Sequence, residues 1–138
     1  MIVPRSTIEF KRLSGWSLAY QKDWAVLHPP SGHATLAVVM YDQPSGALQR
    51  RGEVAALLGL PSVKWDNSFP AFIGPDNFPT QNTLGSASLG QRPYLLSYTQ
   101  VTTGIPQQVA IVWANDGTAT QAELAESNQM VQSMRRKR

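Results

Sequence analysis

The fold is decided by residues 13–46, which read LSGWSLAYQKDWAVLHPPSGHATLAVVMYDQPSG. Trp16, Leu18 and Tyr20 alternate with small or polar residues. This period of two predicts a strand with one buried face. A polar break follows that is long enough for a tight turn, and the alternation resumes at Trp24. The first half of the stretch therefore predicts a β-hairpin.

A third strand follows a strong stop signal. Residues 29–32, Pro-Pro-Ser-Gly, nearly force a turn, because proline cannot donate to a strand ladder and glycine accepts a positive φ. Residues 34–41 (ATLAVVMY) are then almost continuously apolar, as expected of a central strand covered on both faces. The whole stretch predicts a three-stranded meander.

Two helices are predicted after this meander. Residues 45–60 place apolar side chains near one stripe, with Ser45 as the N-cap and Pro61 forbidding continuation. Residues 120–134 open with Thr-Gln-Ala-Glu, a capping-box pattern in which a hydroxyl and a carboxylate satisfy reciprocal backbone donors.

Further strands are predicted on both sides of the first helix. They lie within residues 8–13, 83–90, 92–101 and 108–114. An order of strands, helix, loop, strands and helix is typical of an α+β fold. We expect an antiparallel β-sheet flanked by helices, that is, an αβα sandwich.

Residues 61–83, PSVKWDNSFPAFIGPDNFPTQNT, are the most irregular segment. Four prolines predict an ordered loop that folds back on the sheet, with a short helical turn around residues 70–72. The loop also carries four aromatic residues: Trp65, Phe69, Phe72 and Phe78. Half of them are expected to pack inward, and the others to form a partner-binding patch.

The charge of the chain is concentrated at its C-terminus. The net charge is +3, yet the last four residues are basic, so the other 134 carry 8 basic and 9 acidic residues. We expect one monomeric domain over residues 1–134 and a disordered basic tail made of Arg135, Arg136, Lys137 and Arg138. This distribution argues against a nucleic-acid-binding face, and the tail could instead contact anionic lipid headgroups or an acidic partner.

No signal-peptide pattern opens the sequence, and no window is apolar enough for a membrane span. As written, the chain is expected to be cytoplasmic. A mature domain exported to a thylakoid lumen or a periplasm stays open as the alternative.

Residues capable of chemistry do not form a catalytic pattern. The chain has no cysteine, which removes disulfides and thiolate metal sites. His28 and His33 bracket the Pro-Pro-Ser-Gly turn, with Asp42 as a conceivable third ligand, but this falls short of a zinc set. Residues 85–90, GSASLG, lack the Lys-Ser/Thr of a phosphate-binding loop. We therefore expect no enzyme activity, no metal site and no cofactor.

Residues 15–24, GWSLAYQKDW, resemble the opening hairpin of the PsbP-like family, that of the photosystem II extrinsic subunit P. The order of elements is similar from residue 8 to residue 134, although Gln21 stands where the family commonly has proline. The same fold class includes the Mog-type Ran-release factor. The resemblance implies a non-catalytic αβα sandwich that binds or helps assemble a larger protein complex, such as photosystem II or another membrane complex.

Three functions follow as hypotheses. The first is a protein-binding assembly factor that uses the aromatic residues of 61–83 and the basic tail. The second is a small-ligand-binding or enzymatic domain with a pocket between residues 61–83 and the sheet. The third is an adaptor that reaches anionic surfaces through the tail. A concave pocket with several polar groups favours the second hypothesis, and a flat aromatic patch favours the first.

Overall fold

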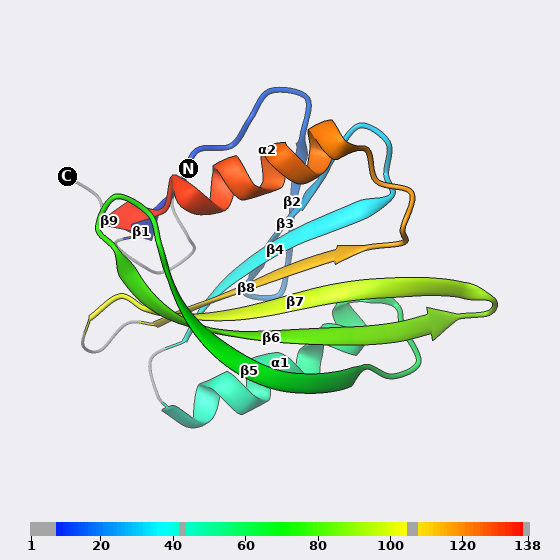
Figure 1. The fold of residues 1–138 in the computed structure, drawn as a ribbon, viewed down its shortest axis with the longest axis horizontal. Coiled ribbons are helices and arrows are strands. Elements are labelled where there is room, and N and C mark those ends of the chain that lie inside the picture. The colour runs from blue at the N-terminus through cyan, green and yellow to red at the C-terminus, as the bar shows by residue number, and fades with distance from the viewer. Residues whose placement is uncertain (1–7, 42–43, 105–107, 137–138) are drawn as a thin grey trace.

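The computed structural model describes residues 8–41, 44–104 and 108–136. Within them the chain forms an α+β fold, as predicted, with a seven-stranded antiparallel sheet and one helix on each of its faces (Figure 1). The sheet has the order β2-β3-β4-β8-β7-β6-β5. Its strands are β2 (Ser17–Gln21), β3 (Trp24–His28), β4 (Ala34–Tyr41), β5 (Lys64–Ile73), β6 (Phe78–Leu89), β7 (Arg92–Thr102) and β8 (Gln108–Asn115). The helices are α1 (Pro44–Leu58) and α2 (Gln121–Gln132), and β1 (Ile8–Glu9) pairs with β9 (Arg135–Arg136) in a second sheet.

The predicted meander is confirmed as β2-β3-β4. β4 lies between β3 and β8, and its residues are buried almost throughout, which explains its continuous apolar run. β2 is an edge strand with mostly exposed residues. The expectation that Tyr20 is buried is therefore wrong, because Tyr20 lies on this edge and is 60% exposed.

Each face of the sheet carries its own core. Under α1, Val54 packs with Trp24 and Tyr98, and the hydroxyl of Tyr98 donates a hydrogen bond of 3.1 Å to the Ala47 carbonyl. Under α2, Met130 and Met134 pack on the sheet together with the apolar residues of the N-terminal segment. The two helices thus lie on opposite faces, and each is fixed by its own apolar cluster.

The helix boundaries are close to those predicted. α1 begins at Pro44, and proline is well suited to a first turn, where its missing N–H has no partner to lose. The side chain of Ser45, the expected N-cap, lies outside the described part of the structure. Gly59 ends the helix with a φ of 68°, and the Leu60 N–H donates to the Ala55 carbonyl at 2.8 Å. Leu48, expected on the apolar stripe, is 73% exposed.

The second helix has the capping box that the sequence predicts. Thr120 Oγ1 accepts from the Glu123 backbone N–H at 3.1 Å, and Glu123 Oε1 accepts from the Thr120 N–H at 3.1 Å. Neither helix of the described segments is long and apolar enough to cross a membrane.

Residues 61–83 are not a long loop, because most of them belong to the hairpin β5-β6. The expected helical turn around residues 70–72 is also wrong, since these residues continue β5. Pro70 is compatible with the strand because β5 is at the edge of the sheet, where a missing N–H need not break a ladder bond. The turn between the strands uses Gly74 and Asn77, both with positive φ.

Strand pairing continues two residues beyond the expected boundary at residue 134. Arg135 Nε lies 2.8 Å from Glu9 Oε1, and the Arg136 guanidinium stacks over the Phe78 ring at 4.9 Å. The first half of the expected disordered tail is therefore β9, while Lys137 and Arg138 lie outside the described residues.

Candidate functional site

A groove runs along the face of the sheet that α2 covers only in part. It has a volume of about 390 Å³. One wall is α2 and the other is the second half of β5, while β4, β6, β7 and β8 supply the floor. In Figure 1, β5 sweeps from beside the C-terminal end of α2 across the sheet toward α1. The curvature of this edge strand makes the surface concave.

The walls of the groove expose large apolar side chains. From β5 come Phe69 and Phe72, which are 46% and 60% exposed, and from α2 comes Leu124, which is 40% exposed. Trp113 lies on the floor, half-buried, with its ring 6.2 Å from that of Trp16. Because most large apolar side chains of the sheet are buried, this gathering of accessible ones marks the groove as a binding surface.

Polar groups line the same groove between the apolar ones. The floor contains Asn82, Ser97 and Thr99, and Thr99 Oγ1 donates to Asn82 Oδ1 at 2.8 Å. The α2 wall contributes Asn128 and Gln132. Every one of these groups is uncharged, and within the described part of the chain no Asp, Glu, Lys, Arg or His lines the groove.

One end of the groove is closed by a contact between the β5-β6 turn and α2. The Gly74 N–H donates to Gln132 Oε1 at 3.1 Å. Gly74 has a φ of 76°, and a side chain there would overlap with the Met134 carbonyl. Only glycine allows this close approach, so the turn and the helix end form one unit.

The four aromatic residues predicted to bind a partner are divided between the surface and the interior. Phe69 and Phe72 line the groove, whereas Phe78 is 1% exposed and belongs to the core under α2. Trp65 is half-buried on the α1 side, 5.8 Å from the Tyr98 ring and covered by the Arg51 guanidinium at 4.9 Å. Half of the set is thus accessible at one site.

Sequence reasoning missed the other components of the groove. Trp113 lies in the apolar strand predicted within residues 108–114, where alternation with Ala110 and Val112 favours a core position. The polar residues of α2 carry no motif, and only the packing of α2 beside β5 brings them to the site. The partial amphipathicity of α2 was the one available signal, since Asn128 and Gln132 interrupt its apolar stripe.

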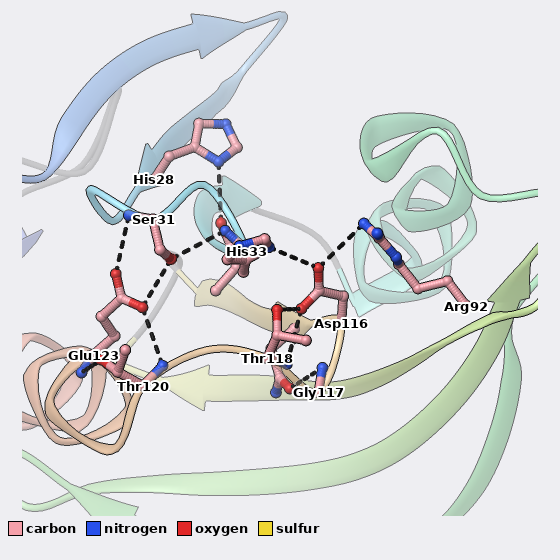
Figure 2. A network of polar contacts seen from close by, with 11 residues as sticks. His28, Ser31, His33, Arg92, Asp116, Gly117, Thr118, Thr120 and Glu123 are labelled. Carbon is pink, nitrogen blue, oxygen red and sulfur yellow. Dashed lines mark hydrogen bonds and ion pairs between the residues drawn. The ribbon is translucent and has the colours of Figure 1, made fainter.

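A second polar site surrounds the Pro-Pro-Ser-Gly turn, which joins β3 to β4 (Figure 2). Asp116 is buried and accepts from Thr118, from His33 Nδ1 at 3.0 Å and from Arg92 Nη1 at 3.4 Å. The hydrogen bond from the Thr118 hydroxyl, more than any other contact, lowers the pKa of Asp116 to about 2, against an opposing effect of burial. The carboxylate is therefore ionised at neutral pH and holds His33 and Arg92 beside a hollow of about 270 Å³.

Glu123 attaches the same turn to the start of α2. Its carboxylate accepts from Ser31 Oγ at 2.8 Å and from the Ser31 N–H at 3.2 Å, in addition to its capping contact with Thr120. Burial raises the pKa of Glu123, but the hydrogen bonds from Ser31 and Thr120 outweigh that effect and leave it below its usual value. The contacts of Glu123 hold the turn against the start of α2.

The two histidines of the turn do not converge. His28 Nδ1 lies 3.1 Å from the Ala34 carbonyl, while His33 faces Asp116. Asp42, the conceivable third ligand, lies outside the described residues. In the described segments, no three His, Cys, Asp or Glu residues are grouped so that they could hold a metal ion.

Comparison with known proteins identifies similar folds only. No protein-family model matches the sequence, and neither does any curated protein sequence. One similar solved structure is that of LpqN of Mycobacterium tuberculosis, a protein involved in cell envelope biogenesis. It is 14% identical to this chain, with a TM-score of 0.62, and the match covers 92% of this chain and 81% of LpqN. A Bacteroides thetaiotaomicron protein is 9% identical with a TM-score of 0.68, over 100% of this chain and 48% of that protein.

The cyanobacterial PsbP of Synechocystis is 13% identical to the chain with a TM-score of 0.52, over 97% of this chain and 95% of that protein. The fold is PsbP-like. At such low identities the likeness extends to the fold and to nothing finer, so membership of the PsbP-like family does not follow from it. The PsbP-like arrangement agrees with the order of elements expected along the chain.

Proposed function

We propose that this PsbP-like domain is a non-catalytic protein-binding module whose partner occupies the groove between α2 and β5. The observation that carries the proposal is the exposure of Phe69, which shares the α2 face with its pairing partner Asn82, opposite Leu124 on the α2 wall; Phe72 also lines the groove. Aromatic anchors beside a concave surface are the usual centre of a protein interface.

The walls are held rigidly enough to serve as a preformed site. β5 is paired to β6 along most of its length, and its turn is bonded to the end of α2. Pro70 restricts the backbone between the two exposed phenylalanines. A preformed surface loses less conformational entropy on binding than a flexible one, which favours affinity.

The proteins with similar folds suggest what kind of partner the domain binds. One is cyanobacterial PsbP and another is a protein involved in cell envelope biogenesis. We propose that the partner is a component of a larger complex, with photosystem II or another membrane complex as the first candidates, and that the domain acts as an assembly factor. This part of the proposal rests on likeness of fold and on the resemblance of residues 15–24.

A site-specific crosslinking experiment tests the proposal. A photoreactive phenylalanine analogue is placed at position 72, in the groove, and in a matched protein at position 48, which is exposed on α1 on the other face. In extracts of the native host, one partner is expected to be crosslinked from position 72 and not from position 48. Phe69→Ser should suppress that product, and equal crosslinking from both positions would contradict the proposal.

With the purified partner, Phe69→Ser and Phe72→Ser should each weaken binding by about 2 kcal/mol or more, because anchors of this type dominate interface energies. Leu48→Ser is the control and should leave affinity unchanged. Circular dichroism should show the same fold for all three variants, since none of the replaced side chains is buried and the least accessible, Phe69, is 46% exposed.

A small-ligand-binding domain is the second candidate. The volume of the groove, about 390 Å³, lies within the range of small-molecule sites, and polar groups are present among the apolar ones. Native mass spectrometry of the purified protein separates the two functions. A retained small molecule that is lost in Phe72→Ser would favour this second candidate.

A further inference from the structure

The floor of the groove continues along the sheet as an apolar track. Leu84 is paired with the floor residue Ser97, so the two side chains share one face, and Leu95 lies on that face because it is two residues from Ser97. Leu84 and Leu95 are 48% and 60% exposed. The accessible surface therefore starts at the closed Gly74 end and extends beyond Trp113 toward the β6-β7 hairpin.

We infer that this track receives an extended, uncharged peptide segment of a partner protein, with its apolar side chains at alternate positions. The inference rests on the proposed protein-binding function and specifies the chemistry of the partner. From Thr99 to Leu95 the track is about 13 Å long, at roughly 3.3 Å per strand residue, which corresponds to about four residues of an extended chain.

Among the described residues, those that line the groove part of the track carry no charge, and this selects against charged segments there; Lys64 shares the face only at the far end, in the row of Leu95. An Asp, Glu, Lys or Arg of the partner would lose its hydration in the groove without gaining a counter-charge, which is strongly unfavourable. The basic residues Arg135 and Arg136 do not compensate, because they lie in β9, where the Arg135 guanidinium pairs with Glu9 and the Arg136 guanidinium donates to the Thr103 carbonyl. Binding should therefore depend little on salt.

The polar groups of the lining favour an extended main chain over a helix. A helix satisfies its own backbone groups, so it would bury the side-chain amide of Asn128 and the hydroxyl of Ser97 without offering them backbone partners. An extended segment brings free N–H and C=O groups to these positions. The Asn128 amide both donates and accepts, which suits a main chain of either direction.

The extended segment is held by side chains of the groove and not by the edge of β5. Pro70 interrupts the N–H groups of that edge strand, and an interrupted edge is a poor template for an added strand. The apolar side chains of the segment meet Phe69, Trp113 and Leu95 in turn, while its main chain faces Ser97 and Asn128.

The test is a phage-displayed random dodecapeptide library selected on the immobilised protein, with synthetic peptides then measured by calorimetry. Enriched peptides should be uncharged at their centre, with apolar residues at i, i+2 and i+4. Their affinity should fall about tenfold in Asn128→Ala, recover in part in Asn128→Gln, and stay unchanged between about 0.05 and 0.5 M salt. Leu48→Ser should bind them as the parent does.

Three outcomes would overturn the inference. The extended segment would be refuted by enriched peptides that have apolar residues at i, i+3 and i+4 and form a helix on binding. The neutral segment would be refuted by enriched charged peptides whose affinity depends on salt. Both outcomes would leave the protein-binding function intact. Enrichment of peptides whose binding survives Phe69→Ser would place the extended-peptide site elsewhere. A failure of the crosslinking at position 72 would instead refute the proposed function itself.

Discussion

Trp24→Ala tests the packing of the first hairpin against α1. Trp24 is 1% exposed and lies in the cluster that contains Val54 and Tyr98. Removal of a fully buried tryptophan side chain loses its transfer free energy and leaves a cavity, so we expect the free energy of unfolding to fall by about 3–5 kcal/mol.

The hydrogen bond of the indole adds little to this loss. Trp24 Nε1 donates to Glu53 Oε2 at 3.1 Å, but Glu53 also accepts from Arg50 Nη1 at 2.9 Å. The carboxylate is therefore not left without a partner when the indole is removed. Trp24→Phe retains most of the ring and loses the donor, and should cost about 1–2 kcal/mol, which separates the contribution of volume from that of hydrogen bonding.

Urea denaturation followed by circular dichroism measures both effects. At a slope of about 2 kcal/mol per M, the midpoint of Trp24→Ala should shift down by about 1.5–2.5 M with an unchanged slope. A loss below about 1 kcal/mol would refute the reasoning, because it would mean that the indole is at the surface in solution and that the register of β2 and β3 is different.

Gly74→Ala should lower the free energy of unfolding by about 2–4 kcal/mol in the same assay, because Gly74 has a positive φ and the added methyl group would overlap with the Met134 carbonyl. Gly52→Ala is the control: this helix position is exposed, no atom lies near it, and the change should stabilise the protein by about 0.5–1 kcal/mol. Asp116→Asn should destabilise the protein at neutral pH. The difference in the free energy of unfolding between variant and parent should disappear as the pH falls from about 4 to 2. A carboxylate whose pKa is lowered in the folded state stabilises the fold above its unfolded pKa and loses that contribution as it is protonated. A variant difference that persists below pH 2, measured by thermal melts across the pH series, would argue against this linkage. Zinc or a chelator should leave the melting temperature unchanged, since His28 and His33 face different partners; an upward shift with zinc that His28→Ala removes would show a metal site.

Much of the fold follows from local signals in the sequence. The alternation after residue 16, the Pro-Pro-Ser-Gly stop and the run at 34–41 are each enough to define β2, β3 and β4, because strand period and turn chemistry act over a few residues. The capping box at Thr120 likewise marks the start of α2. The lack of cysteine and the scattered carboxylates are equally visible without a structure.

Only the tertiary structure decided the nature of residues 61–83 and the location of the groove. Prolines in that segment predict a loop by local rules, but Pro70 is tolerated because β5 becomes the edge of the sheet, a property that depends on the order of all seven strands. The pocket expected beside this segment has Phe69 and Phe72 on one wall, yet Trp113, Asn128 and Gln132 join them from β8 and α2. No local pattern links residues so far apart in the chain, because their proximity arises only when α2 packs on one face of the sheet and β5 curves toward it.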